Sequence, residues 1–268
     1  MIERTRTGDV VTIRLDRPAA RNALTTEGLE ALGRAARTLE SARVGEECRF
    51  EAPSADRAGE FDLERSEPPT DHTPPTVCYL EGAGSAFCAG ADLDVVAALD
   101  REGAEAFARL GQRVANALAE TPLVTVAGID GPARGGGLEL ALACDLRVAT
   151  PDATFGEPGV TFGLFGAWGG THRLPRIVGE GNALDLACTG RVVDAETARR
   201  MGLVSRLESD PRAVAETVAE RPRDALSVLK TRLRDTDGRG AQERREATAF
   251  GRLLEAHAAD IEALRRRE

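Results

Sequence analysis

Residues 123–149 hold the stretch that decides the fold: LVTVAGIDGPARGGGLELALACDLRVA. The apolar run at 123–128 is typical of a strand buried on both faces, and 146–149 is a second strand candidate. Between them, three glycines at 135–137 lead into a nearly all-apolar segment at 138–144, which predicts a buried helix. Strands that alternate with helices in this way indicate an α/β domain.

The pattern extends in both directions from this stretch and divides the chain into two units. Residues 1–194 are expected to form the α/β core, and residues 195–268 to be helical with no further strand. The elements expected elsewhere in the core are a strand at 8–16, a helix from 25 to about 41, a strand at 76–80 and a helix from about 103 to 119.

Residues 45–75 differ in composition from the rest of the core. They hold nine acidic residues against three basic ones, and so carry −6 of the chain's net charge of −9. Four prolines close the stretch. High charge with few apolar residues favours a surface insertion or mobile loop. A regulatory or partner-binding element is the alternative, although no residue pattern supports it specifically.

The overall composition excludes several classes of protein. With 42% hydrophobic and 29% charged residues, the chain reads as soluble and globular, and it has no apolar run long enough for a membrane span. No secretory signal precedes the first strand. The five cysteines are scattered without a CxxC pair, which favours a reducing cytoplasm and excludes a disulfide scaffold or a cysteine zinc site. The three histidines are also dispersed, so no metal site is expected.

The charge balance disfavours nucleic acid as a partner, because no long basic face stands out against the net charge of −9. Of the 35 basic residues, 34 are arginine and one is Lys230. This bias fits either a GC-rich genome or a salt-rich cytoplasm. The helical end at 221–268 carries 12 bases against 9 acids, so the acidity lies mostly within 45–75.

The glycine triplet at 135–137 points to chemistry. Glycines at a helix start let the backbone approach a ligand, and the free N–H groups there face outward at the positive end of the helix dipole. Such a site stabilises an oxyanion, and a second N–H from the separate turn at 90–92 would complete a two-donor hole. Two donors on one oxygen suit a thioester carbonyl that becomes an enolate. Glu139 lies in the same helical turn, where the dipole alone also favours an acid.

Taken together, the glycine-rich stretches resemble the crotonase family, also called the enoyl-CoA hydratase/isomerase superfamily. The resemblance covers residues 8–44 and 76–235 and depends on the order and spacing of many motifs. These motifs are Arg17-Pro18 with Asn22-Ala23-Leu24, GAG at 82–84, AFCAGADL at 86–93, GGGLELA at 135–141, ACDLR at 143–147, GGT at 169–171, RLPR at 173–176, TGR at 189–191, Ala198 and GLV at 202–204.

The resemblance implies an α/β fold built as a spiral of ββα units, followed by a helical C-terminal region that packs in trimers, often paired as hexamers. It implies an acyl-CoA thioester substrate and a place in fatty acid metabolism. Coenzyme A would then be part of the substrate, with no separate cofactor.

The resemblance also implies roles for individual residues. The oxyanion donors would be the backbone N–H groups of Ala91 and Gly136, and Glu139 would be the first family carboxylate, a general acid/base. Further residues would contact the CoA moiety: Ala89, Asp92 and Leu93 along its chain, and Arg21 and Lys230 at its phosphates. For Arg21 and Lys230, a solvated surface role is the alternative.

The chain departs from the family pattern at the second glutamate of the hydratases, where it has Gly159. Glu157 lies two residues away and would point the same way on extended backbone, although it could be displaced too far to reach the substrate. Trp168, the only tryptophan, stands in the next family loop and either lines the acyl pocket or only packs.

The departure bears on the reaction. Hydration of a conjugated double bond is served well by two carboxylates, whereas a 1,3-proton shift needs only one base. We therefore expect an enoyl-CoA hydratase/isomerase that acts on 2-enoyl-CoA thioesters, with hydration placed marginally first. The alternatives are a Δ3-Δ2 enoyl-CoA isomerase with Glu139 as sole base, another reaction of the family, and a non-catalytic acyl-CoA-binding relative.

Overall fold

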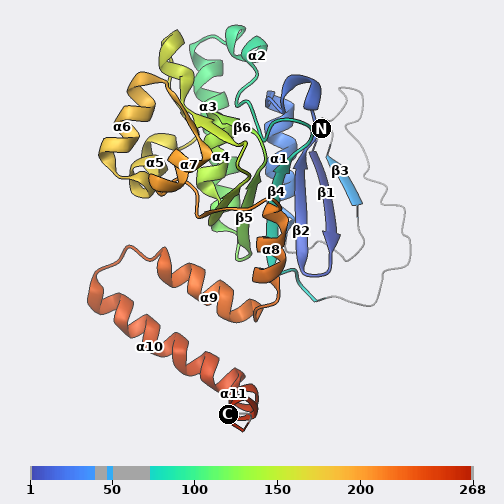
Figure 1. Ribbon diagram of the computed structural model, residues 1–268, viewed down its shortest axis with the longest axis vertical. Coiled ribbons are helices and arrows are strands. Elements are labelled where there is room, and N and C mark those ends of the chain that lie inside the picture. The colour runs from blue at the N-terminus through green and yellow to red at the C-terminus, as the bar shows by residue number, and fades with distance from the viewer. Residues whose placement is uncertain (1, 40–46, 51–72, 267–268) are drawn as a thin grey trace.

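The apolar run at 123–128 becomes strand β5 (Val124–Ile129), which lies inside the main sheet and has all six residues buried. The computed structural model of the chain describes residues 2–39, 47–50 and 73–266 (Figure 1). In that part, the main sheet has seven strands in the order β10-β7-β5-β4-β2-β1-β3. The other strands of the sheet are β1 (Ile2–Thr7), β2 (Val10–Leu15), β3 (Glu47–Phe50), β4 (Val77–Gly82), β7 (Leu146–Ala149) and β10 (Arg206–Leu207).

Pairing in the main sheet changes from antiparallel to parallel along its width. Strand β1 pairs antiparallel with β2 and β3, whereas β2, β4, β5, β7 and β10 are joined by parallel ladders. A smaller sheet lies beside the main one in the order β6-β8-β9. Its strands are β6 (Pro132–Arg134), β8 (Thr154–Gly156) and β9 (Val192–Asp194).

Helices cover the sheet and build the C-terminal end of the chain. They are α1 (Thr26–Arg37), α2 (Leu93–Ala97), α3 (Arg101–Glu120), α4 (Gly136–Ala143), α5 (Gly170–Val178), α6 (Glu180–Thr189), α7 (Ala195–Arg200), α8 (Pro211–Ala219), α9 (Arg223–Leu233), α10 (Arg239–Ala256) and α11 (Ala258–Arg265). Short 3₁₀ turns span Pro18–Ala20 and Pro158–Phe162. None of the described helices has both the length and the apolar composition that a membrane span requires.

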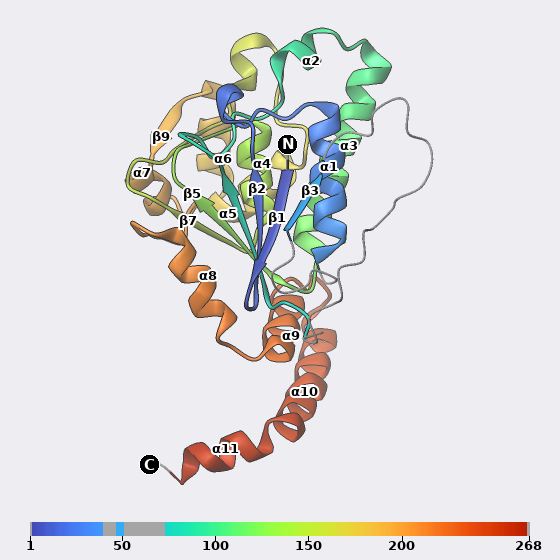
Figure 2. The ribbon, with the colours of Figure 1, turned by 90° about the vertical axis from the view of Figure 1, so that its right-hand side faces the viewer.

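Both faces of the parallel strands are buried, which explains their continuous apolar runs. Helix α8 covers one face, where Val214 and Ala215 pack with Val77, Val126 and Val148. The opposite face belongs to the larger core that α1, α3 and α4 complete. Figure 2 shows α8 on one side of the strands and α1 with α3 on the other. The sheet therefore forms a rigid base for the loops at its edge.

A buried ion pair ties helix α9 to the sheet. Lys230 is 9% exposed; its Nζ lies 2.9 Å from Asp145 Oδ2 and donates to Leu123 O at 2.7 Å. Arg234 reaches the other oxygen of Asp145 at 2.7 Å, and Asp145 also accepts hydrogen bonds from the backbone and hydroxyl of Thr125. Asp145 thus joins the start of β5, the end of α4 and α9.

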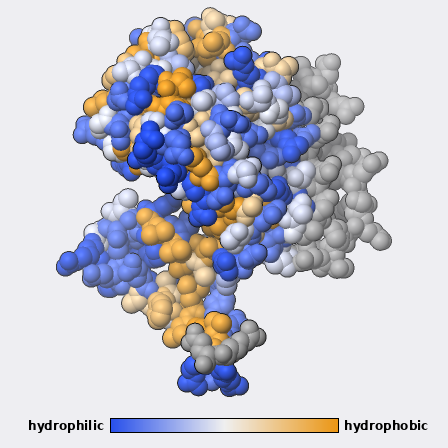
Figure 3. Space-filling view, viewed as in Figure 1, coloured by the Kyte–Doolittle hydropathy of each residue, from blue (hydrophilic) through white to orange (hydrophobic). Residues whose placement is uncertain are grey.

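Helices α10 and α11 project away from the sheets (Figures 1 and 2). Apolar side chains gather along this C-terminal end, as the orange surface in Figure 3 shows. Six of its large apolar side chains are exposed: Leu229, Leu233, Phe250, Leu254, Ile261 and Leu264. The chain is helical from α8 to α11.

The expected α/β class is confirmed, with some errors in its elements. The sequence prediction missed β1, and the expectation of no strand beyond residue 195 is wrong, because Arg206 and Leu207 pair with β7. Part of the 45–75 stretch is not an insertion loop, since residues 47–50 form β3 at the edge of the sheet. Residues 51–72, the greater part of that stretch, lie outside the described residues.

Candidate active site

The glycine triplet turns the chain from β6 into helix α4. Gly135 has φ +47° and ψ −122°, a conformation that favours glycine, and its N–H donates to Gly156 O of β8 at 3.0 Å. At Gly137, an added Cβ would lie 2.2 Å from Cys88 O. Every residue of α4 is buried. The helix start is therefore held between β8 and the segment that follows β4.

Two segments far apart in sequence meet at this point. Cys88 N donates to Pro132 O at 3.1 Å, and Arg134 N donates to Cys88 O at 3.0 Å. Gly90 has φ +94°, and a Cβ on it would lie 3.1 Å from Gly136 N. Over the described ranges, the N–H groups of Ala91 and Gly136 have no protein acceptor. The structure thus brings the two predicted oxyanion donors to one place.

Glu139 stands one turn into α4 and is 1% exposed. Its Oε1 accepts two backbone hydrogen bonds, from Trp168 N at 2.7 Å and from Gly170 N at 2.6 Å. Its Oε2 is bonded to no described residue. Burial raises the pKa of Glu139 to about 7, against the opposing effect of the two amides and of Arg173. One oxygen is thus fixed and the other is available to a ligand.

Glu157 follows β8 and is a second buried carboxyl group. It is 6% exposed, and both of its side-chain oxygens are buried without a hydrogen-bond partner among the described residues. Burial raises its pKa to about 8, and repulsion by Glu139 adds to that shift. An unpartnered buried carboxyl group costs stability, and such groups are concentrated at functional sites.

The two carboxyl groups meet at Gly166. A Cβ added to Gly166 would lie 2.9 Å from Glu139 Cδ and 2.9 Å from Glu157 Oε2, so both groups border the space that a side chain at 166 would occupy. Any larger residue would push into one of them. Glycine at 166 therefore permits the pair, and the pair couples the titration of both groups.

Trp168 packs behind the site. Its indole is 3% exposed and meets the ring of Phe107 edge-on at 5.7 Å. A Cβ at Gly111 of α3 would lie 2.1 Å from the indole, and one at Gly136 would lie 2.2 Å from it. The indole therefore touches the backbone of a predicted oxyanion donor, while its own amide holds Glu139.

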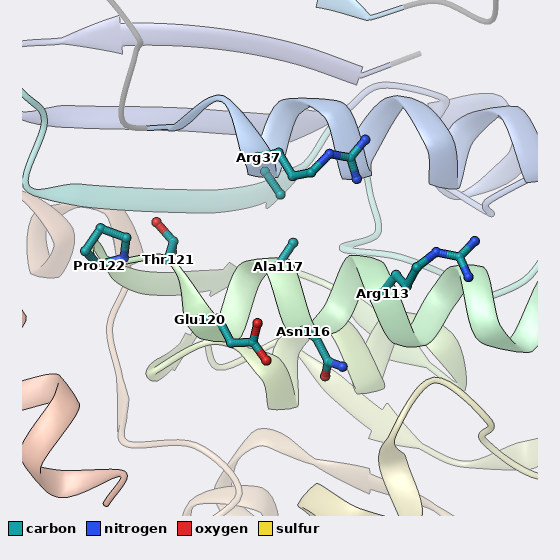
Figure 4. Close-up of a pocket in the computed structure, with 8 residues that line it drawn as sticks. Arg37, Arg113, Asn116, Ala117, Glu120, Thr121 and Pro122 are labelled. Carbon is teal, nitrogen blue, oxygen red and sulfur yellow. The ribbon is translucent and has the colours of Figure 1, made fainter.

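A separate surface pocket lies between the C-terminal ends of α1 and α3. It has a volume of about 480 Å³ and is lined in part by Arg37, Arg113, Asn116 and Glu120 (Figure 4). None of the predicted site residues lines it. Within the described ranges, no group of three or more histidine, cysteine, aspartate or glutamate side chains could hold a metal ion.

The comparison with known families decides the assignment. The sequence matches the profile of the enoyl-CoA hydratase/isomerase family over residues 70–259, more than half of the chain. The chain belongs to the enoyl-CoA hydratase/isomerase family.

Individual relatives agree with this assignment. A Mycobacterium leprae protein assigned as an enoyl-CoA hydratase is 39% identical over 160 residues, which cover 56% of this chain and 60% of that protein. This match spans less than two thirds of that relative's length. An enoyl-CoA hydratase structure from Bacillus anthracis aligns with a TM-score of 0.82 and 26% identity, over 100% of this chain and 96% of that one. A Thermobifida fusca protein assigned as an enoyl-CoA hydratase and solved in complex with CoA aligns with a TM-score of 0.76 and 26% identity, over 96% and 94%.

Gly159, which the sequence resemblance places at the second glutamate of the hydratases, is closely packed. Gly159 lies in the turn Pro158–Phe162, where an added Cβ would lie 3.0 Å from Leu164 O and 3.1 Å from Phe165 Cα. A longer side chain there would need the backbone at 164–165 to give way. The carboxyl group that reaches Glu139 instead belongs to Glu157.

Of the residues predicted to contact CoA, all but Lys230 lie on the segments near Ala91. Ala89 N donates to Arg21 O at 2.9 Å, so Arg21 lies beside the segment that carries Ala91. Arg21 is exposed with φ +50°, and Leu93 is 63% exposed. Asp92 caps α2 and pairs with Arg17. The structure does not bring Lys230 to this site, since it places that side chain in the buried pair with Asp145.

Sequence reasoning missed the residues that hold Glu139. The glycines at 169 and 170 stood out in the sequence, but their function could not be seen there. Gly170 N donates to the carboxylate, and Gly166 leaves room for both carboxyl groups. Arg173, part of the RLPR motif, contacts Trp168 O and acts on the pKa of Glu139. The available sequence signals were the GGT and RLPR motifs, which do not show that this segment binds Glu139.

The packing of Trp168 predicts that an alanine at position 111 of α3 destabilises the protein. Alanine normally stabilises a helix relative to glycine by about 1 kcal/mol, but at 111 its Cβ would overlap the indole. Gly111→Ala should therefore lower the free energy of unfolding by about 1–3 kcal/mol in urea titrations. In a Trp168→Ala background, the same change should be neutral or stabilising. Destabilisation of equal size in both backgrounds would contradict this packing.

The buried state of Glu157 predicts an unusual pH dependence of stability. In the unfolded chain this group loses its proton near the ordinary value of 4.5, whereas in the folded protein it keeps the proton to about 8. Its contribution to stability therefore falls as pH rises between these values, by up to about 1.4 kcal/mol per unit. Glu157→Gln should gain stability relative to wild type from about pH 5 to about pH 8, as measured by urea unfolding.

Glu196→Gln is the matched control, because Glu196 is an exposed glutamate on α7. Its stability difference from wild type should stay nearly constant over the same pH range. A Glu157→Gln difference that also stays constant would show that Glu157 titrates normally.

Proposed function

We propose that this chain is an acyl-CoA-processing enzyme that adds water to 2-enoyl-CoA thioesters through an enolate held by backbone donors. The carrying observation is that two buried carboxyl groups, Glu139 and Glu157, meet at Gly166, and that Glu139 lies within one helical turn of the donor Gly136. Hydration needs both a base for water and an acid for the α-carbon, and this pair supplies one of each.

The backbone donors would act on the thioester carbonyl. As water attacks the β-carbon, the electron pair of the double bond moves toward the carbonyl oxygen and an enolate forms. The N–H groups of Ala91 and Gly136 are unoccupied by protein acceptors and stand at the positive end of α4. Loss of one such donor typically raises the barrier by about 3 kcal/mol.

The two carboxyl groups would divide the proton transfers. Glu139, with a pKa of about 7, is ionised in part at neutral pH and can take a proton from water through its free Oε2. Glu157, with a pKa of about 8, stays protonated there and can give its proton to the α-carbon. One turnover leaves Glu139 protonated and Glu157 ionised. Their proximity at Gly166 allows the proton to return.

One observation favours a second candidate, the Δ3-Δ2 enoyl-CoA isomerase. Gly159 stands where hydratases of the family have their second glutamate, and a 1,3-proton shift needs only Glu139. The same glycine is the basis of the third candidate, an acyl-CoA-binding relative without turnover. The retained and hydrogen-bonded Glu139 argues against that third candidate.

Substitution of each carboxyl group separates these reactions. Glu139→Gln should abolish hydration of crotonyl-CoA, and Glu157→Gln should lower its kcat roughly 100-fold. Glu196→Gln should retain wild-type turnover. If Glu157→Gln keeps full activity on a 3-enoyl-CoA while wild type does not hydrate crotonyl-CoA, the isomerase replaces the hydratase. Tight CoA-ester binding without either turnover would contradict both.

We propose contacts to CoA for the residues that lie near Ala91. Arg21, Ala89, Asp92 and Leu93 lie on the segments that meet at Ala91, and the exposed guanidinium of Arg21 suits a phosphate. Lys230 has less support, because its ammonium group is already paired with Asp145. Coenzyme A would enter as part of the substrate, and the proton transfers described above use side chains only.

We also propose that the protein assembles as a trimer or a pair of trimers. The exposed apolar side chains of α9 to α11 support this, since a stable single chain rarely leaves so many together. Analytical ultracentrifugation of the full chain should give a mass that is three or six times that of one chain. Phe250→Glu, at a side chain that is 69% exposed, should shift it toward monomer without loss of helix content. A monomeric wild type would contradict the assembly.

A cytoplasmic location is proposed on the state of the cysteines. Cys78, Cys88, Cys144 and Cys188 are free thiols, and the first three are buried. Free buried thiols suit a reducing compartment.

A further inference from the structure

Arg173 of α5 is a half-buried cation beneath the turn at 168–170. Its Nη1 donates to Trp168 O at 3.2 Å, and its Nη2 donates to Asn116 Oδ1 of α3 at 2.6 Å. Gly169 has φ +105°, and a Cβ there would lie 2.1 Å from Nη1. Among the described residues no carboxylate forms an ion pair with Arg173. The hydrogen bonds of the guanidinium therefore go to the turn and to Asn116, and not to a described carboxylate.

The turn is also what grips Glu139. The amides of Trp168 and Gly170 donate to Glu139 Oε1, and the peptide between Trp168 and Gly169 stands between those two donors. The carbonyl of that middle peptide accepts from Arg173. A group that fixes the middle peptide therefore fixes the direction of both flanking N–H groups.

The charged groups that face Glu139 and Arg173 affect the pKa of each of them. Glu139 faces Glu157 and Arg173, and the positive charge of Arg173 lowers the pKa of Glu139 against the larger effect of burial. Arg173 in turn faces Glu139 and Glu120 as acids, Arg234 as a second cation, and the thiol of Cys144. Arg173 is the cation that acts on Glu139 in this set.

We propose that Arg173 is a positioning residue for Glu139: it holds the Trp168–Gly169 peptide so that the flanking amides grip one carboxylate oxygen, and its charge favours the ionised form of that carboxylate. Only the use of Glu139 as a base rests on the proposed function. The grip and the charge effect are properties of the unliganded protein.

The only tryptophan in the chain provides the readout. Because the amide of Trp168 is bonded to Glu139, its fluorescence should follow the ionisation of that carboxyl group. A pH titration of wild type should show a transition near the pKa of about 7, and Glu139→Gln should lack it. A transition that survives in Glu139→Gln belongs to another group such as His172 or Glu157, and the Glu157 midpoint should fall when the charge of Glu139 is removed. A wild type without a Glu139-dependent transition would overturn the proposal.

Removal of the charge should move the transition upward. Arg173→Met takes away the stabilisation of the ionised carboxylate, so the midpoint should rise by roughly half a pH unit or more. Arg173→Lys retains the charge and should stay near the wild-type midpoint. Arg176→Met is the matched control, since Arg176 is an exposed arginine on the same helix, and its hydrogen bonds within the described residues go to His172. A folded Arg173→Met with an unchanged midpoint would overturn the proposal.

A second variant keeps the test decisive if Arg173→Met does not fold. Asn116 is exposed, and Asn116→Asp would place a carboxylate on Arg173 Nη2 and neutralise part of its charge. The midpoint of Glu139 should again rise, and an unchanged midpoint would contradict the proposal. Where turnover is found, the acid limb of kcat/KM should move by the same amount. A fluorescence shift without turnover would retain the role of Arg173 and reject the proposed reaction.

Discussion

The burial of two carboxyl groups against one glycine is the constraint on which the rest of the site depends. Glu139 and Glu157 are almost fully buried, and both border the space that a side chain at Gly166 would occupy. Two negative charges that lie close together in a buried site repel each other, so the pair retains a proton near neutral pH. The fold compensates one member only: Glu139 receives two amides and the field of Arg173, while Glu157 receives no partner among the described residues. In the proposed reaction, this asymmetry makes Glu139 the base and Glu157 the acid.

The backbone around the pair is shaped by contacts that leave no space for a Cβ. Gly90 lies against Gly136 N, Gly137 against Cys88 O, and Gly169 against the guanidinium of Arg173. The first two contacts bring together segments from different parts of the chain, and the third is local to the start of α5. The rigid sheet beneath them, buried on both faces, keeps these loops in register. The well-packed sheet and its helices thus offset the stability that the protein loses by burying Glu157 without a partner among the described residues.

Much of this arrangement follows from the sequence, and the remainder depends on long-range contacts. The periodicity of 123–149 predicts β5, α4 and β7, and the family motifs predict the meeting of Ala91 with Gly136. Edge strands β3 and β10 were missed because short strands carry little periodic signal. The reach of Glu157 to Gly166 and the place of Lys230 beside Asp145 could not be predicted, since both depend on side-chain packing between distant elements.

The central claim is that the paired donors and the paired carboxyl groups act on one bound thioester. A crystal structure with a non-reactive enoyl-CoA analogue tests it most directly. The account predicts the thioester oxygen at about 2.7–3.1 Å from the N atoms of both Ala91 and Gly136. It also predicts that the α- and β-carbons lie between the carboxyl groups of Glu139 and Glu157. An analogue whose carbonyl lies elsewhere, or whose α-carbon is out of reach of Glu157, would contradict the account.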